Sequence, residues 1–179
     1  MEKKTLKVTR ETITKLTQNL TMLAFQNESK YFEIMKHSKL SIHRKFTLKY
    51  NRKHSFIATL ENIQDYLLFL FENLQLELST FILALIYIDR NPLELCLTRK
   101  TFHLLLFVAF VVALKINEDR IMSHKVMCSL IDIPMTLLRN LDSNFLEAID
   151  YNLYVDEETY KEYALSIREL ILNVGECNF

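Results

Sequence analysis

Glycine and proline are almost missing from this chain. Its 179 residues include one glycine, Gly175, and two prolines, Pro92 and Pro134. Because glycine supplies the positive φ angles of tight hairpin turns, its scarcity disfavours a sheet protein with many turns. The phosphate loop of nucleotide-binding proteins, the dinucleotide-binding fingerprint and the nucleophile elbow of hydrolases all require glycine, so the chain lacks these motifs. The composition predicts helices.

Cysteine is also scarce, and charge of one sign is not in excess. Cys96, Cys128 and Cys177 are far apart, odd in number and form no CxxC motif. This disfavours zinc and a disulfide framework, and predicts an intracellular, reducing environment in the cytoplasm or nucleus. The N-terminus has no apolar h-region, so we expect no secretory signal. Lys+Arg and Asp+Glu number 22 each, so any basic surface must be local.

Apolar residues at helical spacing predict about seven helices and no strand. Ser79 or Thr80, Thr98 or Thr101, and Asp156 or Thr159 are the polar residues expected to cap helices, and Pro134 is expected at the first position of its helix. The predicted helices cover residues 13–25, 60–74, 81–90, 102–114, 121–130, 134–149 and 156–172.

The longest apolar run, Phe102–Leu114, stops at Lys115. A bilayer span needs about twenty apolar residues, and this run has thirteen residues, of which twelve are apolar. We therefore predict a helix buried on all sides at the centre of a bundle. His103, in its first turn, is expected to be a hydrogen-bonded structural group, because no second ligand stands four residues on. Tyr66 and Phe69 lie off the apolar stripe of their helix and are expected to pack against the N-terminal helix, with exposure to a partner as the alternative.

A basic segment, Lys36–His54, holds seven Lys or Arg, three His and no acid. The simplest interpretation is a solvated linker between two helical units. The alternative is an anion-binding or docking patch, or an import signal, because clustered positive charge attracts anions locally even on a neutral protein. Such a patch would consist of Arg44, Lys45, Lys49, Arg52 and Lys53.

The residue types of a catalytic centre do not come together in the sequence. There is no HExxH motif and no pair of ExxH motifs for a di-iron site. Glu157 and Glu158 fall in the expected first turn of a helix, where the helix dipole favours acids. We therefore predict no catalytic residue, no metal, no cofactor and no small-molecule substrate.

Three segments in order resemble the cyclin box, and most closely that of the P-type (U-type) cyclin group. They read FILALIYIDR at Phe81–Arg90, FHLLLFVAFVVALKINED at Phe102–Asp119 and LRNLDSNFLEAIDYNLYV at Leu138–Val155. The resemblance covers Asp65–Tyr163. It implies an all-α fold with a single cyclin box, a five-helix bundle around a buried central helix, plus one helix at each end. The implied division is residues 1–55 for the N-terminal helix and basic linker, 56–155 for the box, and 156–179 for the C-terminal helix and tail.

The resemblance implies a regulatory subunit that forms a heterodimer with a cyclin-dependent kinase. Such a subunit activates the kinase by positioning its αC helix and activation loop, and carries out no chemistry itself. In the family, a lysine that closes the central helix and an acid on a later helix form a pair at the kinase interface, and their matches are Lys115 and Asp142. Asp89 matches an acid that supports the box internally. The apolar neighbours implied for the interface are Ile116, Leu146 and Tyr151.

The chain departs from the family pattern at three places. Asp142 is one methylene shorter than the usual Glu. Phe69 stands where the family has an Arg, so the usual ion pair with an acid such as Asp89 is missing. Glu118-Asp119 replaces the usual Asp-Asp after the lysine.

Three other interpretations remain open. A cyclin-fold nucleic-acid or transcription adaptor is disfavoured because such proteins use two tandem repeats and this chain has one. A helical scaffold without a kinase partner is compatible with the same helices. A membrane hairpin from Phe81–Ile88 and Phe102–Leu114 is disfavoured by the shortness of both segments, so we expect no membrane partner.

Overall fold

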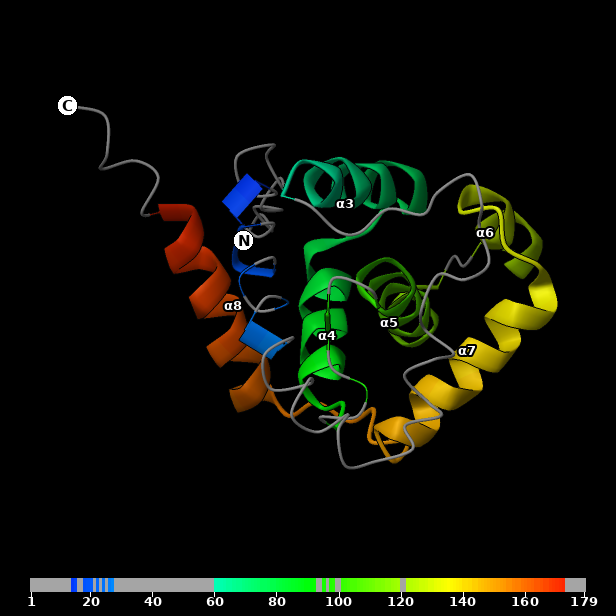
Figure 1. The fold of residues 1–179 in the computed structure, drawn as a ribbon. Coiled ribbons are helices and arrows are strands. Elements are labelled where there is room, and N and C mark those ends of the chain that lie inside the picture. The colour runs from blue at the N-terminus through cyan, green and yellow to red at the C-terminus, as the bar shows by residue number, and fades with distance from the viewer. Residues whose placement is uncertain are drawn as a thin grey trace.

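The computed structural model shows a helical bundle, confirming the predicted all-α class (Figure 1). Among the described residues, every regular element is a helix. The helices are α3 (Leu60–Leu74), α4 (Leu78–Asp89), α5 (Phe102–Asn117), α6 (His124–Leu130), α7 (Met135–Ala148) and α8 (Glu157–Leu172). The structure describes residues 14–15, 18–20, 22, 24, 26–27, 60–92, 95, 97–98, 101–119 and 122–172.

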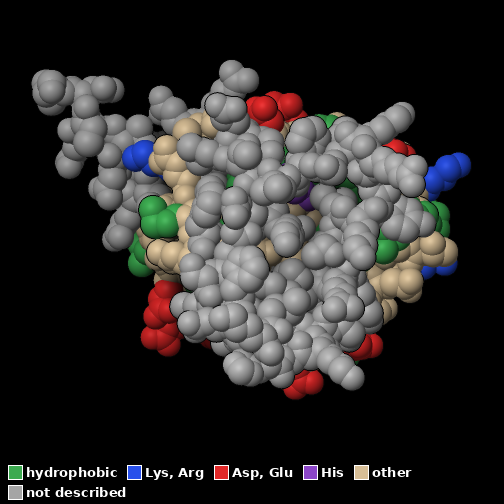
Figure 2. Space-filling model, viewed as in Figure 1, with side chains coloured by type: hydrophobic (Ala, Val, Ile, Leu, Met, Phe, Trp, Pro, Cys, Tyr) green, Lys and Arg blue, Asp and Glu red, His purple; other side chains and the backbone are tan. Residues whose placement is uncertain are grey.

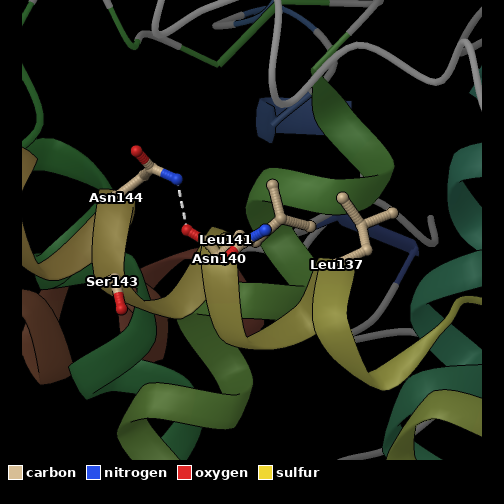
Figure 3. A pocket seen from close by; sticks show the side chains of 5 residues that line it. All are labelled: Leu137, Asn140, Leu141, Ser143 and Asn144. Carbon is tan, nitrogen blue, oxygen red and sulfur yellow. Dashed lines mark hydrogen bonds between the residues drawn. The ribbon is translucent and has the colours of Figure 1, made fainter.

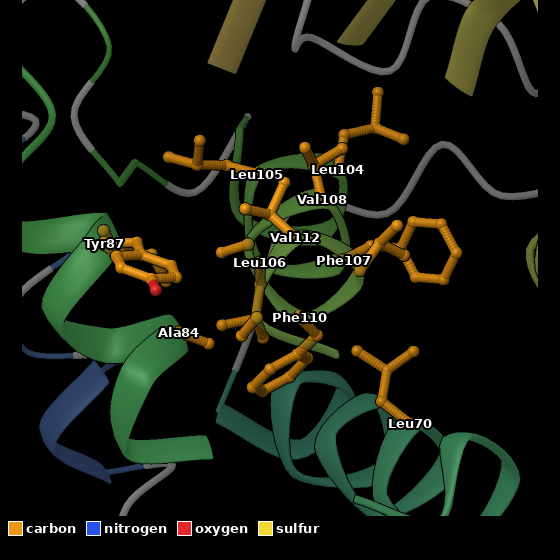
Figure 4. Close-up of a cluster of buried hydrophobic side chains, with 14 of the residues drawn as sticks. Leu70, Ala84, Tyr87, Leu104, Leu105, Leu106, Phe107, Val108, Phe110 and Val112 are labelled. Atoms are coloured by element: carbon orange, nitrogen blue, oxygen red, sulfur yellow. The ribbon is translucent and has the colours of Figure 1, made fainter. Parts of the chain in front are cut away.

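Helix α5 occupies the centre of the bundle, as its apolar run predicts. All thirteen residues of Phe102–Leu114 are buried, so α5 has no solvent face before its last turn. It contacts α3, α4 and α7, and Figure 4 shows Leu70 of α3 and Tyr87 of α4 directed towards it. Full burial of one large apolar side chain contributes about 1.5–3 kcal/mol, so this helix organises the core.

The start of α4 differs from the prediction. Glu77, not Ser79 or Thr80, is the N-cap residue, and it makes no side-chain capping bond. Thr80 lies inside the helix and is fully buried, and its hydroxyl donates to Glu118 Oε1 at 2.7 Å. A hydrogen bond from a distant helix end therefore replaces the local capping role that the sequence suggests.

The other helix starts follow the predictions within a few residues. Thr101 is the N-cap of α5, and its Oγ1 accepts from the backbone N–H of Thr98 at 2.9 Å. Ser123 caps α6, so that helix starts at His124 and not near residue 121. Pro134 is the N-cap of α7 and not its first helical residue. Asp156 caps α8 by accepting from the backbone and the hydroxyl of Thr159.

The side chains near the start of α5 pack inward as predicted. Tyr66 donates its hydroxyl to the backbone carbonyl of His103 at 2.8 Å, and the two rings meet edge-on with centroids 4.7 Å apart. Phe69 is half-buried and packs against the core. Both side chains therefore pack inward and are not left exposed for a partner, but the hydrogen bond and the ring contact of Tyr66 are with α5, whereas the sequence predicts contact with the N-terminal helix.

The linker between α7 and α8 is tied to the end of α4. Tyr87 donates its hydroxyl to the carbonyl of Leu153 at 3.0 Å, and Arg90 donates to the carbonyl of Asn152 at 2.7 Å. Leu153 also packs against the core. These bonds hold the linker that carries Tyr151 in one place beside the bundle.

The turns use positive φ angles without glycine. Gln75 follows α3 at φ 52°, Asp132 follows α6 at φ 52°, and Asp150 and Tyr151 follow α7 at φ 53° and 52°. A left-handed conformation costs a non-glycine residue roughly 1–2 kcal/mol. The bundle therefore accepts local strain at these helix ends.

The remaining predictions concern the N-terminal helix, the basic segment, the cysteines and a membrane span. The described positions of the predicted N-terminal helix, such as Leu20 and Ala24, are helical and buried in the common core. The basic segment lies outside the described residues, and so do Cys96 and Cys177. Within the described part of the chain, no helix has the length and apolar character that crossing a membrane requires.

Candidate functional site

The structure brings together the two residues of the predicted pair. Lys115 lies in the last turn of α5, and its Nζ donates to Oδ2 of Asp142 on α7 at 2.5 Å. The helix continues past the apolar run to Asn117, so the lysine is held on a helical backbone. Its side chain is 29% exposed, whereas that of Asp142 is 11% exposed. The pair thus lies at the surface, with the Asp142 carboxylate mostly buried. Its role in kinase binding stays a prediction.

The second oxygen of Asp142 is buried without a donor. Oδ1 accepts no hydrogen bond from any residue that the structure describes. A buried acceptor left unsatisfied costs about 1–3 kcal/mol. Because Lys115 already holds Oδ2, the carboxylate is fixed in orientation, and its buried Oδ1 has no donor among the described residues.

Exposed apolar side chains follow each member of this pair along the chain. Ile116, next to Lys115, is 53% exposed, and Tyr151 is 60% exposed. Leu146 lies one turn after Asp142 on α7 and is partly buried against the core. The backbone N–H of Tyr151 donates to the carbonyl of Leu146 at 2.8 Å, so the predicted apolar neighbours from α7 and its linker are adjacent.

His124 and Arg139 also belong to this neighbourhood, and sequence reasoning missed both. His124 Nε2 is 4.0 Å from Asp142 Oδ2, so α6 contributes a group to the same carboxylate. Burial and the charge of Asp142 raise the pKa of the Cys128 thiol, whereas the charge of Arg139 lowers it, which places both charges near that thiol. The i, i+3 spacing of Arg139 and Asp142 on α7 was the available signal.

Asp89 joins α4 to α8. Its carboxylate accepts from the hydroxyl of Tyr163 at 2.7 Å. Burial first, and then the bond to Asp89, raise the pKa of the Tyr163 phenol. Phe69, at the position of the family's arginine, packs against the core, so a tyrosine hydroxyl from α8 supplies the donor that Asp89 has here. The sequence contained no signal for Tyr163, because 74 residues separate the two.

A hollow of about 420 Å³ lies along another side of α7 (Figure 3). It is lined by Leu137, Asn140, Leu141, Ser143 and Asn144, and Asn144 donates to the backbone carbonyl of Asn140. None of these five side chains is titratable. The described lining of the hollow therefore includes one hydroxyl, that of Ser143, and no acid or base that could activate it.

The predicted basic patch and the possible metal ligands remain to be placed. The anion-binding or docking patch, Arg44, Lys45, Lys49, Arg52 and Lys53, lies outside the described residues. Within the described residues, no group of three or more His, Cys, Asp or Glu is arranged to hold a metal ion.

The fold and the sequence agree with one family. A family model described as Cyclin matches residues 5–153, which is most of the chain. The chain belongs to the cyclin family. The match starts well before residue 56, the predicted start of the box, so it includes the predicted N-terminal helix; that boundary stays a prediction.

A curated relative agrees with the more specific resemblance. This cyclin is 30% identical over 93 residues to a protein named Cyclin-P3-1 from Oryza sativa subsp. japonica. The aligned part is 51% of this chain but 39% of the relative, so the chain matches well under half of that protein's length. The predicted P-type cyclin-box group is confirmed.

Proposed function

We propose that this cyclin is an intracellular regulatory subunit that binds and activates a cyclin-dependent protein kinase. The observation that carries the proposal is the Lys115–Asp142 pair, held on two helices with one buried carboxylate oxygen still without a donor. Family membership supplies the class of partner. A backbone N–H of the kinase would donate to the exposed part of the Asp142 carboxylate, and the remaining N–H groups of Lys115 would donate to backbone carbonyls of the kinase.

The exposed apolar side chains complete the interface in this proposal. Ile116 and Tyr151 would leave water on binding, and an aromatic anchor beside a charged pair is typical of interface hot spots. Leu146 would lie between them and the core. Together these side chains surround the polar pair with apolar surface, which excludes water and strengthens its hydrogen bonds.

The cyclin contributes no reacting group in this mechanism. It is a ligand with higher affinity for the kinase conformer in which the catalytic Lys–Glu ion pair and the metal-binding Asp are in place. The shift in the kinase's conformational equilibrium is set by the difference between the free energies with which the cyclin binds the active and the inactive conformer.

The experiment compares kinase binding and activation by the wild type and a Lys115→Glu/Asp142→Ala double variant. Purified cyclin-dependent kinases are tested for binding to each protein and for phosphorylation of a peptide substrate. We expect one of the kinases to bind and be activated by the wild type, and the double variant to bind it at least about 30-fold more weakly, since disrupting a buried charged pair costs about 2 kcal/mol or more.

Lys161→Glu is the matched control. Lys161 pairs with Glu157 at 2.6 Å on the exposed side of α8, so the same charge reversal is made at a solvated ion pair. We expect it to bind and activate as the wild type does. Circular dichroism must show that the double variant is folded. A kinase that binds the wild type and the folded double variant equally would move the interface elsewhere, and no kinase bound by the wild type would reject the proposal.

A further inference from the structure

Basic side chains come from three helices around Asp142. Lys115 of α5 pairs with its carboxylate, and Nε2 of His124 on α6 is 4.0 Å from the same oxygen. Arg139 lies one turn before Asp142 on α7, and this i, i+3 spacing puts the two residues on neighbouring parts of the helix surface. The charges of Arg139 and Asp142 also act on the same thiol, that of Cys128.

Arg139 is the unneutralised member of this group. It is exposed on α7, and no carboxylate of the described residues lies within ion-pair distance of it. Asp142, the nearest acid along the helix face, already pairs with Lys115. Lys125, next to His124, is exposed as well. Figure 2 shows Lys and Arg side chains projecting from the right-hand edge of the molecule, where α6 and α7 lie in Figure 1.

A partner that covers Asp142 must therefore meet positive charge beside it. Removing the guanidinium from water without a counter-charge would oppose binding, whereas a carboxylate on the partner would offset this cost. A guanidinium offers two parallel N–H donors to a carboxylate, which fixes orientation as well as adding affinity.

We propose that the kinase segment that seats on Lys115 and Asp142 carries an acidic side chain, and that Arg139 binds this carboxylate. The inference rests on the proposed function and names the chemistry of the partner. Arg139 would then act as a specificity determinant: it favours kinases with an acid at the matching position and disfavours those with a base there.

The test measures association and dissociation rates with the purified kinase that binds the wild type. Wild type, Arg139→Glu and the control Lys161→Glu are compared over a range of NaCl concentrations. We expect Arg139→Glu to lower the association rate about ten-fold at low salt, with the difference shrinking as salt screens the charges. Lys161→Glu should leave the rate unchanged.

A charge swap identifies the partner group. Each acidic residue in and next to the αC helix of the kinase is changed to Lys in turn. One of these kinase variants should bind the Arg139→Glu cyclin faster than it binds the wild-type cyclin. Circular dichroism and urea unfolding confirm that both cyclins are folded.

The outcomes separate this inference from the proposed function. Arg139→Glu could leave kinase binding unchanged at every salt concentration, or reduce it with no charge swap that restores it. Either result overturns the inference of an acidic partner residue, while the proposal of kinase binding stands. If no kinase binds the wild type, both proposals are rejected. A short DNA duplex is tested in parallel. If the wild type binds this duplex and Arg139→Glu abolishes the binding, Arg139 contacts nucleic acid and the inference is overturned.

Discussion

Thr80 illustrates how a residue that is typical of helix caps is used instead in the tertiary structure. Its buried hydroxyl donates to Glu118 at 2.7 Å and accepts from Asn117 Nδ2 at 2.9 Å. These bonds join the start of α4 to the end of α5, close to Lys115. A local pattern could not reveal this, because the partners are 37 and 38 residues away.

Thr80→Val should therefore destabilise the fold. Valine keeps the shape but leaves Glu118 and Asn117 without this partner, and we expect the free energy of unfolding to fall by about 1–3 kcal/mol. Urea unfolding followed by circular dichroism measures the change. Ser79→Ala, at a neighbouring half-buried hydroxyl that also accepts from Asn117, is the control and should cost about 0.5 kcal/mol or less. Equal losses for the two variants would contradict the structural role of Thr80.

At the scale of elements, the helices end without the residue that usually ends them. Glycine is favoured after a helix because it adopts positive φ without strain. After α3 this place belongs to Gln75 at φ 52°. The next residue, Leu76, is buried and its N–H donates to the carbonyl of Phe71, so the chain must turn there. Packing of Leu76 explains why the strained backbone is kept.

Gln75→Gly should stabilise the protein. Relief of the left-handed strain exceeds the extra entropy of an unfolded glycine, and we expect a gain of about 0.5–1 kcal/mol in the free energy of unfolding. Chemical denaturation measures it. Glu72→Gly, within the last turn of α3, is the opposite case and should lose about 0.5–1 kcal/mol. A loss of stability in both variants would show that Gln75 is not strained.

At the scale of the whole molecule, several tyrosines are built into the bundle. Burial raises the pKa of Tyr66, and burial also raises the pKa of Tyr87 above the ordinary value despite the nearby charge of Arg90. Because the folded state holds these protons more tightly than the unfolded chain, the stabilisation is fully present below the unfolded pKa of about 10 and is lost as pH rises above it.

An alkaline titration should therefore unfold the protein in one step. We expect helicity to persist up to about pH 9 and then to be lost together with the appearance of tyrosinate absorbance from the buried tyrosines. Tyr154 is 79% exposed, so the control Tyr154→Phe should leave this unfolding step unchanged. Ionisation of every tyrosine near pH 10 with helicity intact would contradict this account.

The sequence by itself determined the helical class, the burial of Phe102–Leu114 and the helices around it. A helix that is apolar on every side has no stable position except the centre of a bundle, so its surroundings need not be known. The motif around Lys115 and Asp142 also identified two residues that lie together in space.

Only the tertiary structure decided what surrounds that pair. His124 reaches Asp142 because α6 and α7 pack against each other. Tyr163 finds Asp89, and Thr80 finds Glu118, in the same way. Hydrophobic periodicity records which side of a helix is buried, but hydrogen bonds and ion pairs between helices depend on how the helices cross, and a single sequence does not specify that crossing residue by residue.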